Sequence, residues 1–357
     1  MKKRILVISN LYPSNKDPFY GTFVKNFIDD LSKSQAIQEL DMCVIKGRSY
    51  KLYNKILKYI VFYIQILFSL SFKKYDLVYV HIITHAAFPL RLVSIFRKLP
   101  LTFNIHGEDL LTQTRLASYF LQMAIPLLKQ AKLIVVPSQF FKSKVLEILP
   151  MIPESKLYVS ASGGVNESFF NSNKHKLNDT PVIGYVSRID RGKGWDIFIQ
   201  SLHILKQKGF NFRGKIIGRG TDISKMKDLI DKLQLQKETD YVGPVEYHNL
   251  PIYYSQFDLF IFPTQLEESL GLVGLEAMAC KVPVIGSRIG GLTDYIKDGI
   301  NGYFFNPLDA TDLSNKIRLF FSKSILEQQN MKEAAYNTAL EYSSTKVSNN
   351  LISKILS

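Results

Sequence analysis

The stretch "LFIFPTQLEESLGLVGLEAMACKVPVIGS", residues 259–287, decides the fold. Its two continuous apolar runs, "LFIFPT" and "VPVIGS", predict buried parallel strands, and the segment between them predicts a helix. Glu268 then lies in the loop at the carboxyl end of the first strand, and Glu276 lies within the helix. Glutamate is rarely buried without a partner. Two carboxylates in this apolar setting therefore predict a ligand-binding site.

The backbone between the two glutamates is suited to an anion. The N–H groups near Gly271, Leu272 and Val273 open the predicted helix, where the first donors have no partner inside the helix. A carboxylate can also accept paired hydrogen bonds from vicinal hydroxyls of a ribose or hexose. We therefore expect a phosphate site flanked by a sugar and a ribose. The alternative is a surface Glu268 and a Glu276 that serves only as a charge near the helix start.

Strand and helix patterns alternate along the whole chain, which predicts an α/β fold with parallel sheets covered by helices. We expect two doubly wound, Rossmann-like domains that face each other across a cleft, with ligands at the carboxyl ends of the strands. The expected divisions are an acceptor-side domain at 1–170, a polar linker at 171–180, a nucleotide-sugar-binding domain at 181–335, and a C-terminal helix at 336–357 that packs back toward the first domain.

A second anion site is predicted in "GYVSRIDRGKGWDIFI". Arg188 and Lys193 follow a strand in a glycine-rich turn that leads into a helix. Glycines let a backbone approach a phosphate closely, and cations with a helix N-terminus favour an anionic group. The segment lacks Walker spacing. It therefore predicts a diphosphate site of another kind, with a solvated basic turn as the alternative.

Two positions in the first half are weaker candidates. Gly21 follows the first predicted strand, where a tight turn explains a glycine as well as ligand approach does. His106 ends the strand in "LTFNIHGEDLL" and is placed either to face the cleft or to be an ordinary core or surface histidine. His81 and His85 lie four residues apart but outside an HExxH motif, so we expect no metal site.

The net charge of +14 in 357 residues points to anionic partners: nucleic acid, phosphorylated small molecules or an acidic membrane face. The basic residues are not interleaved with aromatics on one face, which disfavours nucleic acid. The longest apolar stretch, Tyr59–Phe72, falls short of the roughly 20 residues that span a bilayer. Because lysines flank it, it fits either a buried core helix or a helix lying in an anionic membrane interface.

Taken together, these segments resemble the retaining nucleotide-sugar glycosyltransferases of family 4 (glycosyl transferases group 1), which have the two-domain GT-B fold. The resemblance rests on "ESLGLVGLE" followed by "AMACKVPVIGSRIGGLTDYIKDGINGYFFNPLD", and it runs from about Pro181 to Asp309. The first domain adds "YPSNKDPFYGTF", "NIHGEDLL", "VVPS" and "SGGVNESFF". The resemblance implies a hexosyltransferase that moves a sugar from a nucleotide-diphosphate donor to a saccharide acceptor and retains the anomeric configuration.

The resemblance also implies roles for residues of the second domain. Arg188 and Lys193 match the pair that grips the donor diphosphate and stabilises charge on the departing nucleotide. Glu276 matches the glutamate that binds the ribose, and Glu268 matches the one that contacts hydroxyls of the donor sugar. No protein nucleophile is implied, because the acceptor attacks from the face that the nucleotide leaves.

In the first domain, His106 matches a histidine near the donor sugar and acceptor, and Gly21 matches a loop that lets diphosphate and acceptor approach. The resemblance implies no cofactor and no metal, since cations and a helix dipole take the metal's place. We expect a saccharide or lipid-linked saccharide acceptor in capsule, O-antigen or exopolysaccharide biosynthesis, in the bacterial cytoplasm or at the inner face of the cytoplasmic membrane. The rival hypotheses are a GT-B epimerase or hydrolase, which would turn over donor without acceptor, and a basic nucleic-acid-binding protein.

Overall fold

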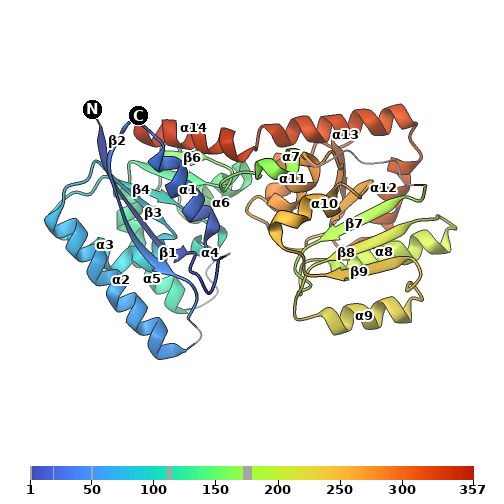
Figure 1. Cartoon of the computed structure of the whole chain (residues 1–357), viewed down its shortest axis with the longest axis horizontal. Coiled ribbons are helices and arrows are strands. Elements are labelled where there is room, and N and C mark those ends of the chain that lie inside the picture. Colours follow the sequence, from blue (N-terminus) through green and yellow to red (C-terminus); the bar gives the residue numbers. More distant parts are fainter. Residues whose placement is uncertain (1, 19, 50, 111–114, 172–178) are drawn as a thin grey trace. The chain divides into compact units, whose positions relative to one another are not determined.

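The computed structural model describes residues 2–18, 20–49, 51–110, 115–171 and 179–357. Its contacts divide the chain into two compact units: unit 1 comprises Met1–Gly163 with Val347–Ser357, and unit 2 comprises Gly164–Lys346. Each unit holds a six-stranded sheet with helices packed against it (Figure 1). The predicted linker, 171–180, lies mostly outside the described residues.

The sheet of unit 1 has the order β2-β1-β3-β4-β5-β6, and every neighbouring pair is parallel. Along β1, Leu6 and Ile8 join the core on one face, while Ile5 and Val7 join the core on the other. A strand covered on both faces must be apolar at successive positions. The strands are β1 (Lys3–Tyr12), β2 (Ile37–Lys46), β3 (Leu77–His81), β4 (Leu101–Asn104), β5 (Leu133–Val136) and β6 (Leu157–Val159).

The two faces of this sheet are covered by different helices. Val24 and Leu31 of α1 pack with Ile5 and Val7, whereas Phe62 of α2 belongs to the core on the opposite face. The helices that unit 1 contributes before residue 163 are α1 (Thr22–Ser32), α2 (Leu52–Phe72), α3 (Ile83–Phe96), α4 (Gly107–Leu110), α5 (Arg115–Gln130) and α6 (Gln139–Ile148), with a 3₁₀ turn η1 (Glu154–Lys156).

Helix α2 is longer than its apolar stretch indicated. It begins at Leu52 and ends at Phe72, so its 21 residues reach the length that can cross a bilayer, contrary to the expectation from Tyr59–Phe72 alone. The first two turns were missed because lysines and an asparagine interrupt their apolar pattern. Phe62, Ile66 and Leu70 are buried at a spacing of four residues and hold one side of α2 in the core.

The sheet of unit 2 has the order β12-β11-β10-β7-β8-β9 and is also parallel throughout. The first strand, β7, is central, and the chain adds β8 and β9 on one side before it crosses to β10 on the other. The switch in strand order therefore falls between β7 and β10, where ligands bind in doubly wound sheets. The strands are β7 (Val182–Val186), β8 (Arg213–Ile217), β9 (Thr239–Gly243), β10 (Leu259–Phe262), β11 (Val284–Ser287) and β12 (Gly302–Phe305).

The expectation of parallel sheets with helices between the strands is confirmed, although β12 was not predicted because its four residues sit inside the turn-rich "NGYFFNPLD". The helices of this half are α7 (Glu167–Phe170), α8 (Trp195–Gln207), α9 (Ile223–Lys232), η2 (Tyr247–Asn249), α10 (Leu250–Tyr254), α11 (Leu272–Ala279), η3 (Gly290–Asp294), α12 (Ala310–Phe321) and α13 (Ile325–Leu340).

The C-terminal segment contains a break that the sequence did not indicate. Helix α13 ends at Leu340, and α14 (Ser344–Leu356) follows a three-residue turn, where one helix at 336–357 was expected. Leu351 and Ile355 of α14 are buried in the same core as Ile5 and Val7 of β1. The end of the chain is therefore an integral part of unit 1.

This packing predicts that Leu351→Ala destabilises the protein. Leu351 is 6% exposed, and a buried leucine cut back to alanine loses about 2–5 kcal/mol of the free energy of unfolding. Denaturant-induced unfolding measures the change. Ile325→Ala on α13 is the control, because Ile325 is 75% exposed and should change the same quantity by less than about 0.5 kcal/mol. Equal effects of the two substitutions would contradict the buried position of α14.

Candidate functional site

The loops that follow β7 and β10 meet at the switch point of the unit 2 sheet. The Gln265 N–H donates to the Gly192 carbonyl oxygen at 2.8 Å and joins the two loops. Gly194 has a φ of 75°, and a Cβ there would overlap the carbonyl oxygen of Pro263. Only glycine combines that backbone conformation with so close an approach. The glycines of the "RGKG" turn thus bring the two loops together.

This contact places Lys193 beside Glu268. Lys193 Nζ lies 2.7 Å from Glu268 Oε1, and the two side chains are only 13% and 21% exposed. Thr264 Oγ1 donates to the same Oε1 atom at 3.1 Å, and the Tyr185 hydroxyl donates to the Lys193 carbonyl oxygen at 3.2 Å. Two residues that are far apart in the sequence therefore form a partly buried ion pair at the strand ends.

A third loop holds the backbone of Glu268. The Gly291 N–H donates to the Glu268 carbonyl oxygen at 2.7 Å. A Cβ at Gly290 would lie 2.7 Å from the Glu268 nitrogen, and Gly290 has a φ of 61°. The "IGG" that follows β11 is thus a packing requirement, because it lets this loop close against the loop that carries Glu268.

Arg188 lies on the same loop as Lys193 but does not join the ion pair. Its Nη1 atom is 3.2 Å from Asp190 Oδ2, and its side chain is 69% exposed. The Thr221 N–H donates to Asp190 Oδ1 at 2.8 Å and holds the pKa of that carboxyl below its usual range. Arg188 is therefore a solvent-exposed cation next to an ionised aspartate.

Helix α11 begins directly after Gly271, as predicted. Gly271 is its N-cap residue, with φ 83° and ψ 60°, and its carbonyl oxygen accepts a hydrogen bond from the Tyr295 hydroxyl at 3.0 Å. Leu272 and Val273 are the first two helical residues. Their N–H groups lie in the first turn, where no partner exists inside the helix and the helix dipole favours an anion.

Glu276 lies deeper in α11 than a solvent-facing ligand would. The residue is 5% exposed, and the Tyr254 hydroxyl donates to its Oε2 atom at 3.3 Å. Burial raises the pKa of the Glu276 carboxyl to about 7, and hydrogen bonds from Tyr247 and Tyr254 offset part of that rise. The sequence analysis missed both tyrosines, because no spacing rule links "EYHNLPIYY" to a helix that begins more than 15 residues later.

The two glutamates thus have different environments. Glu268 is paired with a cation, whereas Glu276 is buried between hydroxyl donors. One carboxylate beside a cation and one buried carboxyl beside hydroxyl donors are suited to two different roles. Among the described residues, no group of three or more His, Cys, Asp and Glu side chains is placed to hold a metal ion.

In unit 1, His106 follows β4 and stacks with His81, the last residue of β3. The ring centroids lie 6.0 Å apart with an angle of 14° between the planes, and the Phe23 ring of α1 makes T-shaped contacts with both imidazoles. Neither ring nitrogen of His81 has a hydrogen-bond partner among the described residues. Burial lowers the pKa of His106 to about 4 and holds the pKa of His81 well below its usual range. Both imidazoles are therefore neutral at pH 7.

Gly21 caps the N-terminus of α1 with a φ of 71°. A Cβ at this position would overlap the carbonyl carbon of Leu11, near the end of β1. The turn and its close packing are sufficient reasons for glycine here. Gly21 lies beside β1 at the switch point between β1 and β3 of the unit 1 sheet.

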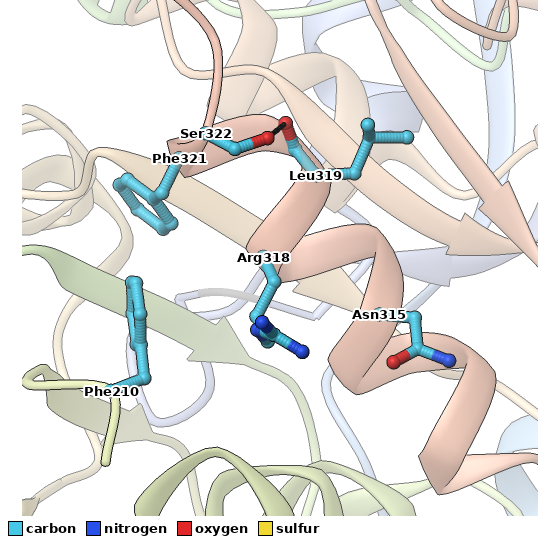
Figure 2. A pocket seen from close by; sticks show the side chains of 6 residues that line it. All are labelled: Phe210, Asn315, Arg318, Leu319, Phe321 and Ser322. Atoms are coloured by element: carbon cyan, nitrogen blue, oxygen red, sulfur yellow. Dashed lines mark hydrogen bonds between the residues drawn. The ribbon is translucent and has the colours of Figure 1, made fainter. Parts of the chain in front are cut away.

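A cavity of about 430 Å³ lies elsewhere on unit 2 (Figure 2). Phe210 and Phe321, with ring centroids 5.5 Å apart, form part of its wall together with Arg318 of α12. It shares no residue with the site at the strand ends, and Arg318 is the one charged side chain that lines it. It therefore adds nothing to that site.

Comparison with known proteins finds a family that resembles the part of the chain that carries these strand ends. Residues 167–338 match the family model described as "Glycosyl transferases group 1". This part of the chain, somewhat less than half of its length, is therefore similar to group 1 glycosyltransferases. The chain is 32% identical over 207 residues to the capsular polysaccharide biosynthesis glycosyltransferase CapM of Staphylococcus aureus. The aligned region covers 55% of this chain and 53% of CapM. It is 29% identical over 203 residues to the lipopolysaccharide 1,2-N-acetylglucosaminetransferase of Salmonella typhimurium, and the aligned region covers 52% of this chain and 51% of that enzyme.

The chain spans about half the length of these curated relatives. Solved structures match it over nearly its whole length. A glycosyltransferase from Rickettsia africae has a TM-score of 0.75 at 20% identity, covering 100% of this chain and 99% of that one. HepE of Anabaena, solved in complex with UDP, has a TM-score of 0.76 at 17% identity and covers 99% of each chain. These likenesses confirm the GT-B fold.

The burial of Glu276 predicts a pH-dependent stability. The carboxyl has a pKa of about 7 in the folded protein and an ordinary pKa near 4.5 when unfolded. Between these values the folded state holds a proton that the unfolded state has lost, so stability falls as pH rises through that window. Glu276→Gln removes this contribution. We expect the free energy of unfolding of the variant, relative to the natural protein, to increase from pH 5 to pH 8 in urea titrations.

Glu246→Gln is the matched control for this experiment, because Glu246 is exposed on the same unit. Its free energy of unfolding should follow that of the natural protein at both pH values. A constant difference between Glu276→Gln and the natural protein from pH 5 to pH 8 would show that Glu276 is not a buried, protonated carboxyl.

The burial of His81 in unit 1 predicts the opposite dependence of stability on pH. Its pKa is lowered by burial, so below about pH 6.5 the unfolded state binds a proton that the folded state does not, and stability falls as pH drops. His81→Leu should leave the urea midpoint at pH 7 unchanged or higher, because it removes a buried polar group that has no hydrogen-bond partner among the described residues. It should also lose less stability between pH 7 and pH 5. The exposed His248→Gln should behave as the natural protein does.

Proposed function

We propose that the chain is a retaining glycosyltransferase that moves a sugar from a nucleotide-diphosphate donor to a saccharide acceptor. The observation that carries the proposal is the partly buried Lys193–Glu268 pair at the switch point of a domain similar to group 1 glycosyltransferases, next to the N-terminus of α11. A switch point at the carboxyl ends of parallel strands is where such sheets bind nucleotides. The site there offers a cation, two carboxylates and a helix start.

Lys193 is suited to the departing diphosphate. An ammonium has three N–H donors, so Lys193 can hold Glu268 and still donate to a phosphate oxygen. As the bond between the anomeric carbon and the diphosphate oxygen breaks, negative charge grows on the nucleotide. Lys193, the exposed Arg188 and the N–H groups of Leu272 and Val273 stabilise that charge in place. These groups would make a metal ion unnecessary.

The two glutamates divide the recognition of the donor. Glu268 is fixed by Lys193, Thr264 and the Gly291 N–H, and its carboxylate accepts from hydroxyls of the sugar. Glu276 accepts from the ribose hydroxyls, with Tyr254 orienting the carboxyl. Because the acceptor hydroxyl attacks the anomeric carbon on the face that the nucleotide leaves, the departing diphosphate oxygen takes up the hydroxyl proton. No covalent sugar–protein intermediate forms.

In unit 1, His106 serves the transferred sugar or the acceptor. A neutral imidazole offers one donor and one acceptor nitrogen and repels no cation. The stacking of His106 on His81 fixes the plane of the ring. Gly21 lets the loop that follows β1 pack closely against the last residues of β1.

The relatives favour a role in cell-surface polysaccharide synthesis. The names of these relatives refer to capsular polysaccharide, to lipopolysaccharide and, for a putative glycosyltransferase of Escherichia coli, to colanic acid biosynthesis. We propose that this chain acts in a pathway of that kind, in the cytoplasm or at the inner face of the membrane, on a saccharide or lipid-linked saccharide acceptor. Peripheral contact with an anionic membrane forms part of this proposal.

A thermal-shift screen against UDP, GDP and ADP sugars tests the donor class, because ligand binding raises the unfolding temperature as the logarithm of its concentration over Kd. UDP sugars come first, since a structural neighbour was solved with UDP.

With the donor found, Lys193→Ala should lower the rate of sugar transfer to the acceptor by a factor of about 10²–10³, which is the usual loss when one group that stabilises developing charge is removed. Product anomers read by NMR should retain the donor configuration, and EDTA should leave the rate unchanged.

Lys237→Ala is the control, because Lys237 is an exposed lysine of the same unit. It should transfer at the rate of the natural protein, and both variants should keep its unfolding transition. Natural activity in Lys193→Ala would refute the proposed site. Donor loss at the same rate with and without acceptor would instead indicate an epimerase or hydrolase.

A further inference from the structure

Helix α2 is apolar on the side that faces away from its own core. Phe62, Ile66 and Leu70 are buried, and the other residues of this 21-residue helix are exposed or half-buried. At 100° per residue, the positions opposite the buried row carry further large apolar side chains. The exposed members of this row are Tyr53 (62% exposed), Leu57 (58%), Ile60 (49%), Ile64 (59%), Phe68 (64%) and Phe72 (76%).

Helix α3 continues this apolar surface. It packs against α2, and the two helices lie side by side in Figure 1. The Tyr63 and Phe88 rings join them at 5.8 Å between centroids. The exposed residues of α3 recur at helical spacing, so they share one side. They are Phe88 (45% exposed), Leu92 (40%), Ile95 (66%) and Phe96 (83%), and with the α2 row they make up the α2–α3 apolar face.

The charges around this face have one sign. Neither helix contains an aspartate or glutamate, and between residues 51 and 98 the sequence has eight lysines and arginines against one acid, Asp76. Lys51, Lys55 and Lys74 are exposed at the two ends of α2. Lys73 is already held by Glu39 and Asp41, so it contributes less to an external partner.

The apolar rows and the single sign of the surrounding charge distinguish between the partners that could cover this face, a second copy of the chain and a lipid bilayer. Soluble monomers rarely expose large contiguous apolar patches without a partner. A second copy that docked the same face would bring two sets of like charges together, since a symmetric interface pairs identical patches. An anionic bilayer surface offers an apolar layer for the rows and negative headgroups for the lysines.

Helix α2 is also held in a way that suits lying on a bilayer rather than crossing it. Phe62, Ile66 and Leu70 belong to the same core as Leu6 and Ile8 of β1. A spanning orientation would extract them from that core. Arg97 at the end of α3 donates to the Leu70 carbonyl oxygen at 2.6 Å and ties down the last turns of α2.

We infer that the α2–α3 apolar face is a docking surface for an anionic lipid bilayer, on which α2 and α3 lie with their exposed rows in the headgroup region. This inference identifies the membrane contact of the proposed function and rests on that function for the role of the contact, which is to bring the enzyme to a lipid-linked acceptor. The docking itself is measurable without any substrate.

Vesicle co-sedimentation of the full chain tests it, with vesicles of equimolar phosphatidylcholine and phosphatidylglycerol and with phosphatidylcholine alone. We expect binding to the anionic vesicles at low salt, weakened by high salt. The triple variant Ile60→Ser, Ile64→Ser, Phe68→Ser should reduce the partition coefficient by at least about tenfold, because binding scales with buried apolar area. Lys51→Gln, Lys55→Gln, Lys74→Gln should reduce binding to the anionic vesicles by about tenfold or more.

The matched control is Ile325→Ser, Leu326→Ser on α13, since these residues are 75% and 70% exposed but belong to unit 2. It should bind vesicles as the natural protein does. All these substitutions are of exposed side chains, and circular dichroism melts confirm folding. Unchanged vesicle binding by the apolar triple variant would overturn the inference. The inference would also be overturned if the natural protein did not bind vesicles and sedimentation velocity instead showed a dimer that dissociates in the apolar triple variant.

The outcome is separable from that of the proposed function. The apolar triple variant should still be stabilised by the nucleotide sugar, and Lys193→Ala should still bind vesicles. Lost docking with intact nucleotide binding would leave the donor site standing, whereas intact docking with no nucleotide binding would refute the donor site alone.

Discussion

The candidate site depends on the parallel pairing of β7 with β10. These strands are separated by more than 70 residues in sequence, yet their pairing brings the loops at their carboxyl ends together. The backbone bond from Gln265 to Gly192 and the glycine at 194 let the loops approach as closely as main chains can. A side chain at residue 194 would force the loops apart and would separate Lys193 from Glu268.

The same sheet edge gives its two glutamates opposite properties. Glu268 sits in a loop whose backbone is held from a neighbouring strand end, and a cation compensates its charge. Glu276 sits inside a helix whose surroundings are apolar, so hydroxyl groups are its partners and its pKa rises to about 7. A ribose that offered two hydroxyls to Glu276 would favour the ionised carboxylate. In the proposed function, nucleotide binding and the protonation of this residue would therefore be coupled.

Most strands of the two sheets could be predicted, because parallel strands that are covered on both faces are continuous apolar runs. The loop position of Glu268 and the helix start after Gly271 followed from the same pattern. The Lys193–Glu268 pair and the tyrosine partners of Glu276 could not be predicted from the residues, because each contact is made by tertiary pairing rather than by local spacing. β12 was missed for a local reason: four apolar residues between asparagines read as a turn, and only pairing with β11 makes them a strand.

Helix α2 shows a different limit of sequence patterns. Its apolar residues fill both sides of the helix, so mean hydropathy is equally high for a helix buried in a core and for one lying in a membrane interface. The stretch from Tyr59 left these alternatives open. The structure shows that they are not exclusive, because one row at Phe62, Ile66 and Leu70 fills the core while the opposite row stays exposed. A helix that fills a core with one side and docks on a bilayer with the other, as we infer for α2, would need apolar residues all round. The lysines inside α2, Lys55 and Lys58, fall in its first two turns and leave the rest of the outer row uninterrupted.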